Sequence, residues 1–350
     1  NRLQFSGDIY QRKTTDMFTV GMSLPAVFGT DVPKGNYADL TTKGFELSVS
    51  WRDQFQLASK PFNYEVRFTL ADYQSTIDKY NNPEKKLGDD YYYEGMKVGE
   101  IWGYETEGFF TSQADIDSHA KQPYFYAGAT AGQWLPGDIK FKDLNGDGVI
   151  DYGNNTVDNP GDQKIIGNSE PRFIYGINLS GDWNNFFVSA FFQGVGKQDW
   201  WPGSEASYFW GMYNRPYNDM PKSHLGNIWT EENPNTYFPR LRGYSSEEPY
   251  AELNLKQTRY LQNIAYIRMK NIQLGYTLPK SFISKLRMQN AKVYVSGENL
   301  WSWSPFYKYS KDLDVEAVRG SDRDLTEGTS GNGYSYPILK SVSFGLSVTF

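Results

Sequence analysis

The chain has 350 residues, of which 17% are aromatic, and a chain with this many rings can bury enough surface to exclude intrinsic disorder. Its 35 basic and 41 acidic side chains give a net charge of -6, which excludes the strongly basic surface of nucleic-acid binders. The absence of cysteine excludes disulfides, thiolate metal sites and cysteine nucleophiles.

The hydropathy of the chain limits which class of membrane protein it can belong to. No window approaches the roughly 18 consecutive apolar residues of a membrane helix, and the mean hydropathy is -0.64, so a helical membrane protein is excluded. A transmembrane β-barrel is compatible with these values, because each of its strands carries only about 9–11 residues of alternating polarity. The first residues contain neither an initiator methionine nor a secretion leader, so we expect a mature or truncated piece.

Alternation of apolar and polar residues is the strongest pattern in the chain. In the last ten residues, small or polar side chains separate every apolar one, and the apolar ones are Val342, Phe344, Leu346, Val348 and Phe350. The same alternation predicts about eight strands, near residues 3–13, 44–51, 62–70, 173–180, 186–194, 264–277, 292–300 and 341–350. Charged residues on the polar faces, such as Glu46, Glu65 and Arg67, require water or a polar lumen.

The connections between these strands alternate between short and long. The short ones cover residues 52–61, 181–185 and 278–291, and the long ones cover residues 14–42, 75–172, 195–263 and 301–339. Outer-membrane barrels have short periplasmic turns and long external loops, so this asymmetry favours an all-β fold, a transmembrane antiparallel β-barrel. A soluble β-sandwich also alternates but gives no reason for the asymmetry. Eight strands can close a small barrel, but a wall that continues upstream fits the many loop residues better.

Residues 143–151 match the first nine positions of a calcium-binding loop. The side chains of Asp143, Asn145, Asp147 and Asp151 supply oxygen atoms at positions 1, 3, 5 and 9. Val149 supplies a backbone carbonyl at position 7. We therefore expect calcium as a cofactor of this loop.

The end of the calcium-like loop departs from the motif. Position 12 is normally a bidentate Glu but is Asn154 here, and Asp158 is a candidate for the closing ligand. The alternative is an Asn/Asp/Gly-rich turn without metal. The only histidines, His119 and His224, sit in no catalytic or metal-binding spacing, and no nucleophile motif is present, so we do not predict an enzyme.

Aromatic residues collect in the long loops. Flat rings stack on sugars and supply rigid contact area for partners, whereas Trp and Tyr near strand ends are typical of a membrane-interface girdle. We assign Trp183, Trp301 and Trp303 to the girdle. The mid-loop cluster is expected to cover the pore or to contact a ligand or partner, and its members are Trp200, Trp201, Tyr208 and Trp210.

Several stretches resemble one family, the SusC/RagA-like transporters of Bacteroidetes outer membranes, which are TonB-dependent receptors. The most specific are PGDIKFKDLNGDG at residues 136–148, IGNSEPRF at 166–173 and FFQG at 191–194. Others are YIRMKNIQLGYTLP at 266–279, VYVSGENL at 293–300 and the ending from residue 336 to Phe350. The resemblance spans essentially the whole chain, in the family's order.

The resemblance implies that residues 1–350 are the C-terminal part of a 22-stranded barrel with long extracellular loops, without the family's plug domain and signal peptide. It also implies location in the outer membrane, contact with lipid, and import of oligosaccharides or peptides. The implied partners are a SusD-like surface lipoprotein and the TonB complex, which would act through the missing N-terminal region. The alternative is an outer-membrane barrel that binds a glycan or a partner without transport.

The final residue has an expected role of its own. A terminal aromatic on an alternating strand is the signal that the barrel-assembly machinery reads in outer-membrane proteins generally, so we expect Phe350 to serve as the assembly signal. The alternative is that the last strand only closes the wall.

Overall fold

One antiparallel sheet of eight long strands dominates the computed structural model, and each strand lies beside the next wall strand along the chain. The structure describes residues 2–20, 27, 29, 32–88, 91–123, 133–204, 206–214, 217, 220–247, 251–318 and 336–350. The wall strands are β1 (Leu3–Val20), β2 (Lys34–Leu57), β3 (Lys60–Lys79), β8 (Arg172–Trp183), β9 (Phe186–Lys197), β12 (Tyr266–Thr277), β13 (Asn290–Trp303) and β14 (Ser341–Thr349). All eight predicted strands are confirmed.

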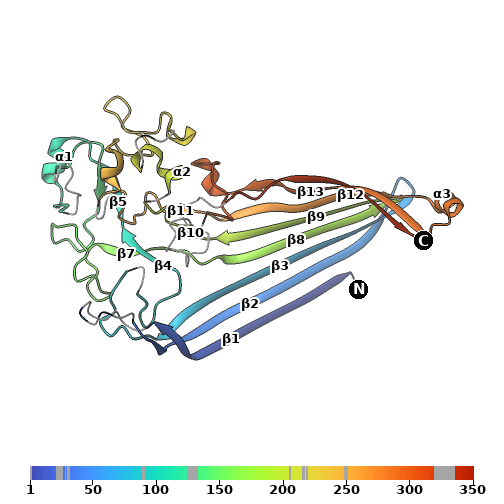
Figure 1. Cartoon of the computed structure of the whole chain (residues 1–350), viewed down its shortest axis with the longest axis horizontal. Coiled ribbons are helices and arrows are strands. Elements are labelled where there is room, and N and C mark those ends of the chain that lie inside the picture. The colour runs from blue at the N-terminus through green and yellow to red at the C-terminus, as the bar shows by residue number, and fades with distance from the viewer. Residues whose placement is uncertain are drawn as a thin grey trace.

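Short turns gather at one end of the sheet and long connections at the other (Figure 1). Two of the turns have two residues with positive φ: Ala58 and Ser59 at 46° and 61°, and Asn184 and Asn185 at 47° and 70°. This backbone matches the twist of the flanking strands, and asparagine adopts it readily. The third short connection carries α3 (Lys280–Ile283) and the 3-10 helix η5 (Ser284–Leu286).

The first predicted long loop is largely strand, which corrects the expected loop over residues 14–42. β1 continues to Val20 and β2 begins at Lys34, with a bulge near Asp16, whose φ is 55°. These added parts of β1 and β2 carry polar residues on both faces. They therefore lack the apolar–polar alternation that indicates a strand in contact with an apolar phase. Backbone pairing alone sustains them beyond the apolar band.

The register brings the apolar faces of all eight strands to one side of the sheet. One continuous row of paired residues crosses the sheet through Leu3, Trp51, Val66, Leu179, Ala190, Ile272, Gly297 and Val342. The adjacent row, which faces the opposite side because side chains alternate, is Gln4, Ser50, Arg67, Asn178, Phe191, Asn271, Glu298 and Ser341. One face is therefore apolar and the other mostly polar.

The apolar face has the height of a bilayer core. In β3 its members run from Phe62 to Leu70, about 26 Å along the strand at roughly 3.3 Å per residue, or about 20 Å of height at the usual strand tilt of about 40°, which approaches the band of about 25 Å on outer-membrane barrels. Aromatic rings pack together near the turn end of this face, where the Phe55 and Phe62 centroids are 5.1 Å apart and those of Phe186 and Tyr276 are 4.7 Å apart. Trp301 and Trp303 lie exposed at the loop end. These positions suit an aromatic girdle at each interface.

The sheet is open. Its edges are β1 and β14, and within the described ranges neither outer edge pairs with another strand. Unpaired backbone N–H and C=O groups cost several kcal/mol each in lipid, so in a bilayer these edges need further strands. No helix in the described part of the chain has the length and apolar character needed to cross a membrane.

The long connections pack together into one mass, which we call the loop body (residues 80–171, 198–265 and 304–318, where described). Its strand pairs are β4 (Glu100–Tyr104) with β7 (Gln163–Asn168), β5 (Thr106–Phe109) with β6 (Ile139–Phe141), and β10 (Asp199–Trp200) with β11 (Gln262–Asn263). Its helices are α1 (Gln113–Ser118), α2 (Ser207–Trp210) and the 3-10 helices η2 (Gly211–Tyr213), η3 (Lys222–His224), η4 (Gly243–Ser246) and η6 (Pro305–Lys308).

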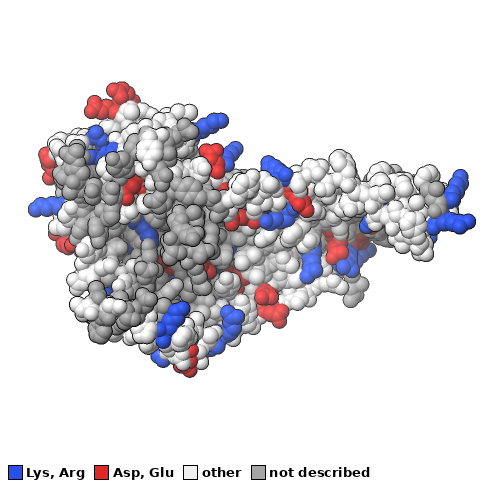
Figure 2. Space-filling model, in the orientation of Figure 1, with Lys and Arg blue, Asp and Glu red and all other residues white. Residues whose placement is uncertain are grey.

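Charged side chains of both signs are scattered over the visible face of the loop body (Figure 2). At the opposite tip, basic side chains project from the turn that carries α3, where Lys280, Lys285 and Arg287 occur. The loop body therefore presents mixed charge to solvent, with no single sign dominating the face shown.

Candidate functional site

An aromatic core holds the loop body together. Trp200 is 4% exposed and Trp210 is fully buried, and the Trp210 Nε1 donates to the carbonyl oxygens of Pro202 and Gly203. Both rings pack edge-on against Phe209 in this core, and the expectation that they cover the pore or contact a ligand or partner stays a prediction. Trp201 packs against the same core, and Tyr208 is 54% exposed, so a contact by Tyr208 stays a prediction.

Both histidines serve the same core. The Nε2 of buried His224 lies 2.9 Å from the carbonyl oxygen of Phe209, and the Nε2 of His119 lies 2.8 Å from that of Phe141. Burial lowers the pKa of His224, so its ring is held neutral. Each histidine is hydrogen-bonded to a backbone carbonyl oxygen, which is typical of a histidine with a structural role.

A buried ion pair involves Asp138, which lies shortly before the calcium-like loop in the sequence. The Arg242 Nε donates to Asp138 Oδ1 at 2.7 Å and its Nη2 donates to Asp138 Oδ2, while Leu135 N donates to the same Oδ2 at 2.7 Å. Asp138 is completely buried. Asp138 belongs to the stretch that carries the family resemblance, but no local pattern marks its partner, because Arg242 lies 104 residues away along the chain.

Glu252 lies beside this pair and is also completely buried. Its Oε2 accepts the backbone N–H of Ile139 at 2.8 Å, and its Oε1 has no hydrogen-bond partner in the described part of the chain. Burial first, and then the charge of Asp138, raise the pKa of Glu252 well above its ordinary value. The raised pKa favours the protonated form of Glu252, whose hydrogen bond to Ile139 N joins the segment at residue 139 to the segment at residue 252.

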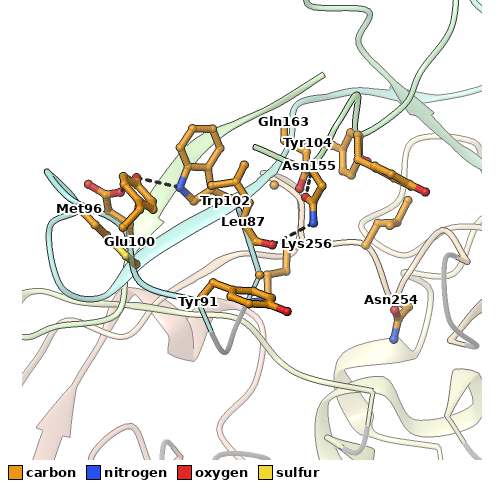
Figure 3. A pocket seen from close by; sticks show the side chains of 15 residues that line it. Leu87, Tyr91, Met96, Glu100, Trp102, Tyr104, Asn155, Gln163, Asn254 and Lys256 are labelled. Atoms are coloured by element: carbon orange, nitrogen blue, oxygen red, sulfur yellow. Dashed lines mark hydrogen bonds between the residues drawn. The ribbon is translucent and has the colours of Figure 1, made fainter. Parts of the chain in front are cut away.

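A pocket of about 400 Å³ opens where several stretches of the loop body meet (Figure 3). Its walls come from β4 and from residues 87–88, 91–96, 152–163 and 254–256. β4 is fixed against residues 256–258 by backbone bonds, because Tyr104 N donates to Lys256 O at 2.8 Å and Thr258 N donates to Tyr104 O at 3.0 Å. The rings that line the pocket are Tyr91, Tyr93, Trp102, Tyr104 and Tyr152.

Hydrogen bonds within the wall hold the pocket's side chains in place. Trp102 Nε1 donates to the Tyr93 hydroxyl at 3.3 Å, and that hydroxyl donates to Glu100. Asn155 Nδ2 donates to the Leu87 carbonyl at 2.9 Å (Figure 3). Because rings and amides dominate and the charges of Glu100 and Lys256 have opposite signs, the pocket suits a neutral ligand with hydroxyl or amide groups.

The calcium-like loop is held in a compact turn by its own side chains. Asp143 accepts the N–H groups of Gly146 and Gly148 at 2.6 and 2.9 Å, which lowers the pKa of its carboxyl group. Asn145 Oδ1 accepts Asp147 N at 2.9 Å, and Asp147 Oδ1 accepts Val149 N at 2.8 Å.

Asp162, which lies outside the calcium-loop motif, joins the two ends of this loop. Its buried carboxylate accepts Leu144 N at 2.7 Å and Asp151 N at 2.9 Å. Asp158, expected as the closing ligand, is exposed and makes no hydrogen bond within the described residues. Among the described residues, no three acidic or histidine side chains converge closely enough to hold a metal ion. Calcium binding therefore stays a prediction.

The polar face of the sheet carries charged and polar side chains that bond to one another. Arg52 Nε lies 2.9 Å from Glu65 Oε2, Asn63 Nδ2 donates to Asp182 Oδ2 at 2.8 Å, and Arg67 Nε donates to Ser48 Oγ at 3.3 Å. These charged and amide side chains require a polar environment, and the lumen of a barrel provides one.

No family model matches the chain. It is 27% identical over 368 residues to TonB-dependent receptor P3 of Formosa agariphila, covering 100% of this chain and 32% of that protein. It is 26% identical over 358 residues to TonB-dependent receptor P26 of the same species, covering 97% of this chain and 32% of the relative. From end to end, the chain is similar to TonB-dependent receptors. It spans about one third of the length of these relatives.

Solved structures agree on the fold. The RagAB peptide transporter matches with a TM-score of 0.68 and 19% identity, covering 100% of this chain and 33% of that chain. The RagAB peptide importer in its closed-closed state matches with a TM-score of 0.68 and 17% identity, covering 100% and 34%. The predicted fold class is confirmed: the antiparallel sheet matches part of the β-barrel wall of these structures and is not closed by itself, with the loop body as its long connections.

Proposed function

We propose that the chain supplies the C-terminal wall and the extracellular loops of an outer-membrane transporter that imports oligosaccharide or peptide nutrients, driven through TonB. The observation that carries this proposal is the pair of opposite rows across the sheet, one apolar and one polar, together with the end-to-end similarity to TonB-dependent receptors. An apolar outer face suits lipid, and a polar inner face suits a solute path. The role is not enzymatic.

The partners follow from the same arrangement. A SusD-like lipoprotein is proposed to cover the loop body, which collects at the end of the barrel opposite the short turns. The TonB complex is proposed to act through an N-terminal region outside this chain. The barrel-assembly machinery is proposed to recognise Phe350, which is 77% exposed at the end of the wall.

The pocket in Figure 3 is the proposed contact site for the nutrient. Its test is uptake of labelled oligosaccharides and peptides by cells of the native host that carry Trp102→Ala in the full-length receptor. Uptake of the nutrient is expected to fall, with Tyr217→Ala, an exposed ring outside this pocket, as the matched control. Unchanged uptake at equal receptor levels would show that this pocket does not contact the nutrient.

The alternative function, a barrel that binds a glycan or partner without transport, is separated by where the ligand goes. Import places labelled ligand in the periplasm and stops when the proton gradient is collapsed. Binding without transport leaves the ligand on the cell surface and is insensitive to the gradient.

Calcium binding by residues 143–151 is proposed as an addition to this function. The proposal is supported by the ligand types at positions 1, 3, 5, 7 and 9 and by the turn that Asp143 already holds. The ion would draw the three carboxylates of the loop together, because without a cation they repel one another. Its role would be to stiffen the loop body over the barrel.

A further inference from the structure

A second cavity in the loop body, which we call the basic cavity, lies between η3 (Lys222–His224), residues 236–238, Arg259 and the end of η6. It encloses about 570 Å³. Among the described residues that line it are two cations, Arg259 and Lys308, and no carboxylate. In this respect it differs from the pocket of Figure 3, whose wall carries both Glu100 and Lys256.

Arg259 is fixed in the wall of the basic cavity. Its Nε donates to Tyr237 O at 3.0 Å, its Nη2 donates to Thr236 O at 2.6 Å, and its guanidinium carbon lies 4.1 Å from the centre of the Phe109 ring. A guanidinium has five N–H donors, so these bonds use two and leave three. Neutral carbonyls orient the group but do not neutralise its charge.

The second cation is equally without a counter-charge. Lys308 Nζ lies 5.4 Å from the centre of the Tyr309 ring, and that ring stacks on Tyr237 with centroids 4.2 Å apart. Neither Lys308 nor Arg259 forms an ion pair with an acidic group in the described part of the chain, although the chain carries more acidic than basic residues. Two uncompensated cations that face one cavity attract an anion.

The rest of the wall indicates what kind of molecule carries the anion. Asn227 Nδ2 donates to the Ser223 carbonyl at 2.8 Å, which leaves Asn227 Oδ1 and the Ser223 hydroxyl without a bond in the described structure. An amide oxygen and a hydroxyl are partners for ligand hydroxyl groups. Hydroxyl partners, tyrosine rings and a cationic pair together match a sugar ring that bears a carboxylate.

We propose that the basic cavity binds the carboxylate of an acidic sugar unit, with Lys308 and Arg259 paired to the anion and Asn227 and Ser223 bonded to ring hydroxyls. The inference rests on the proposed function in that the sugar belongs to the imported nutrient. It adds a second, charge-selective contact to the neutral pocket of Figure 3.

Calorimetry on the full-length receptor purified in detergent tests this proposal with α-1,4-trigalacturonate and its neutral methyl ester. The acid is expected to bind, with the ester weaker by about tenfold or more, the size of a lost charge-assisted hydrogen bond. Lys308→Met is expected to weaken binding of the acid by a similar factor. Lys308→Arg, which keeps the positive charge, is expected to bind the acid as the wild type does. The control is Lys311→Met, a nearby lysine outside the basic cavity, which is expected to leave the affinity unchanged.

Several outcomes would overturn the proposal. They are equal affinity for acid and ester, no binding of the acid by the wild type, and no effect of Lys308→Met. A peptide arm compares trialanine with its C-terminal amide: binding of the free peptide acid but not of trigalacturonate would assign the cavity to peptide carboxylates and reject the sugar. If binding to the basic cavity fails while nutrient uptake persists, the inference is wrong and the proposed transport function stands.

Discussion

Arg172 and Asp72 form a two-point ion pair that joins the start of β8 to the upper part of β3, 100 residues apart in the sequence. Nε donates to Oδ1 and Nη2 donates to Oδ2, each at 2.6 Å, and Phe173 N donates to the same carboxylate at 3.2 Å. The pair fixes the two wall strands at the point where the chain leaves for the loop body and returns from it.

Asp72→Asn is predicted to destabilise the folded wall by about 1.5–3 kcal/mol, because a hydrogen-bonded charge that is mostly buried loses its counter-ion. Arg172→Lys is expected to cost less, since it keeps the charge but loses the paired geometry. Urea unfolding of the full-length receptor, followed by band shift on gels, measures the change. Arg52→Lys is the control, because the Arg52–Glu65 pair is exposed on its Arg side. If Asp72→Asn and Arg52→Lys lowered the free energy of unfolding equally, the Arg172–Asp72 pair would not stabilise the wall more than an exposed pair does.

Ala190→Lys is predicted to impair membrane insertion, whereas Ser189→Lys is not. Ala190 lies in the apolar row near the middle of the band, and its neighbour Ser189 points to the polar face. A lysine at the bilayer midplane of a barrel costs about 2–4 kcal/mol, and a lysine in the lumen meets water. The folded fraction in lipid vesicles measures both variants. If the serine variant were the more damaging, the faces would be reversed.

Deletion of Phe350 separates a recognition role from a structural one. Loss of one exposed apolar ring costs roughly 1.5–3 kcal/mol if the residue only contacts lipid. We expect a larger effect, failed delivery to the outer membrane, because the ring is the proposed assembly signal. Phe344→Ala is the control, since Phe344 is 86% exposed on the same strand but is not terminal. Normal outer-membrane levels of the deletion variant would reject the recognition role.

Asp147→Ala is predicted to abolish binding of one calcium ion to the full-length receptor. The wild-type dissociation constant is expected in the weak extracellular range of about 10⁻⁴–10⁻³ M, because Asn154 replaces the usual bidentate ligand at position 12. Calorimetry with calcium chloride is the measurement. Asp158→Ala is the comparison, and an effect as large as that of Asp147→Ala would restore Asp158 as the closing ligand. Absence of binding in the wild type would refute the site.

Glu252→Gln is predicted to remove a pH dependence of loop-body stability. The pKa of Glu252 in the folded protein lies above its ordinary value of 4.5, so protonated Glu252 stabilises the fold. This contribution to the free energy of unfolding is fully present below pH 4.5. It is lost as the pH rises through the folded pKa, at about 1.4 kcal/mol for each unit of pKa difference.

Proteolysis of the loops against pH checks the Glu252 prediction. The wild type is expected to become more susceptible as the pH rises, and Glu252→Gln is expected to flatten that rise, because the amide keeps the acceptor for Ile139 N without ionising. Glu232→Gln, at an exposed position, is expected to behave as the wild type. Identical profiles for Glu252→Gln and the wild type would exclude Glu252 as the source.

The sequence by itself determined the wall. Strands that contact an apolar phase on one side and water on the other must alternate, so β3, β9 and β14 could be located from residues such as Phe62, Phe186 and Phe344 alone. Turn chemistry at Asn184 and Asn185 is equally local, because it depends on the backbone preferences of those two residues. Neither inference needs a distant partner.

Only the tertiary structure decided the rest. The solvated parts of β1 and β2 pair without an apolar alternation, so nothing local marks them. Trp200 and Trp210 have the composition of a binding surface, but their burial depends on loops that meet from separate parts of the chain. Arg242 with Asp138, and Lys308 beside Arg259, are likewise brought together by packing. Local patterning fixes what alternates along a strand, whereas the fold alone fixes which distant charges share a low-dielectric site.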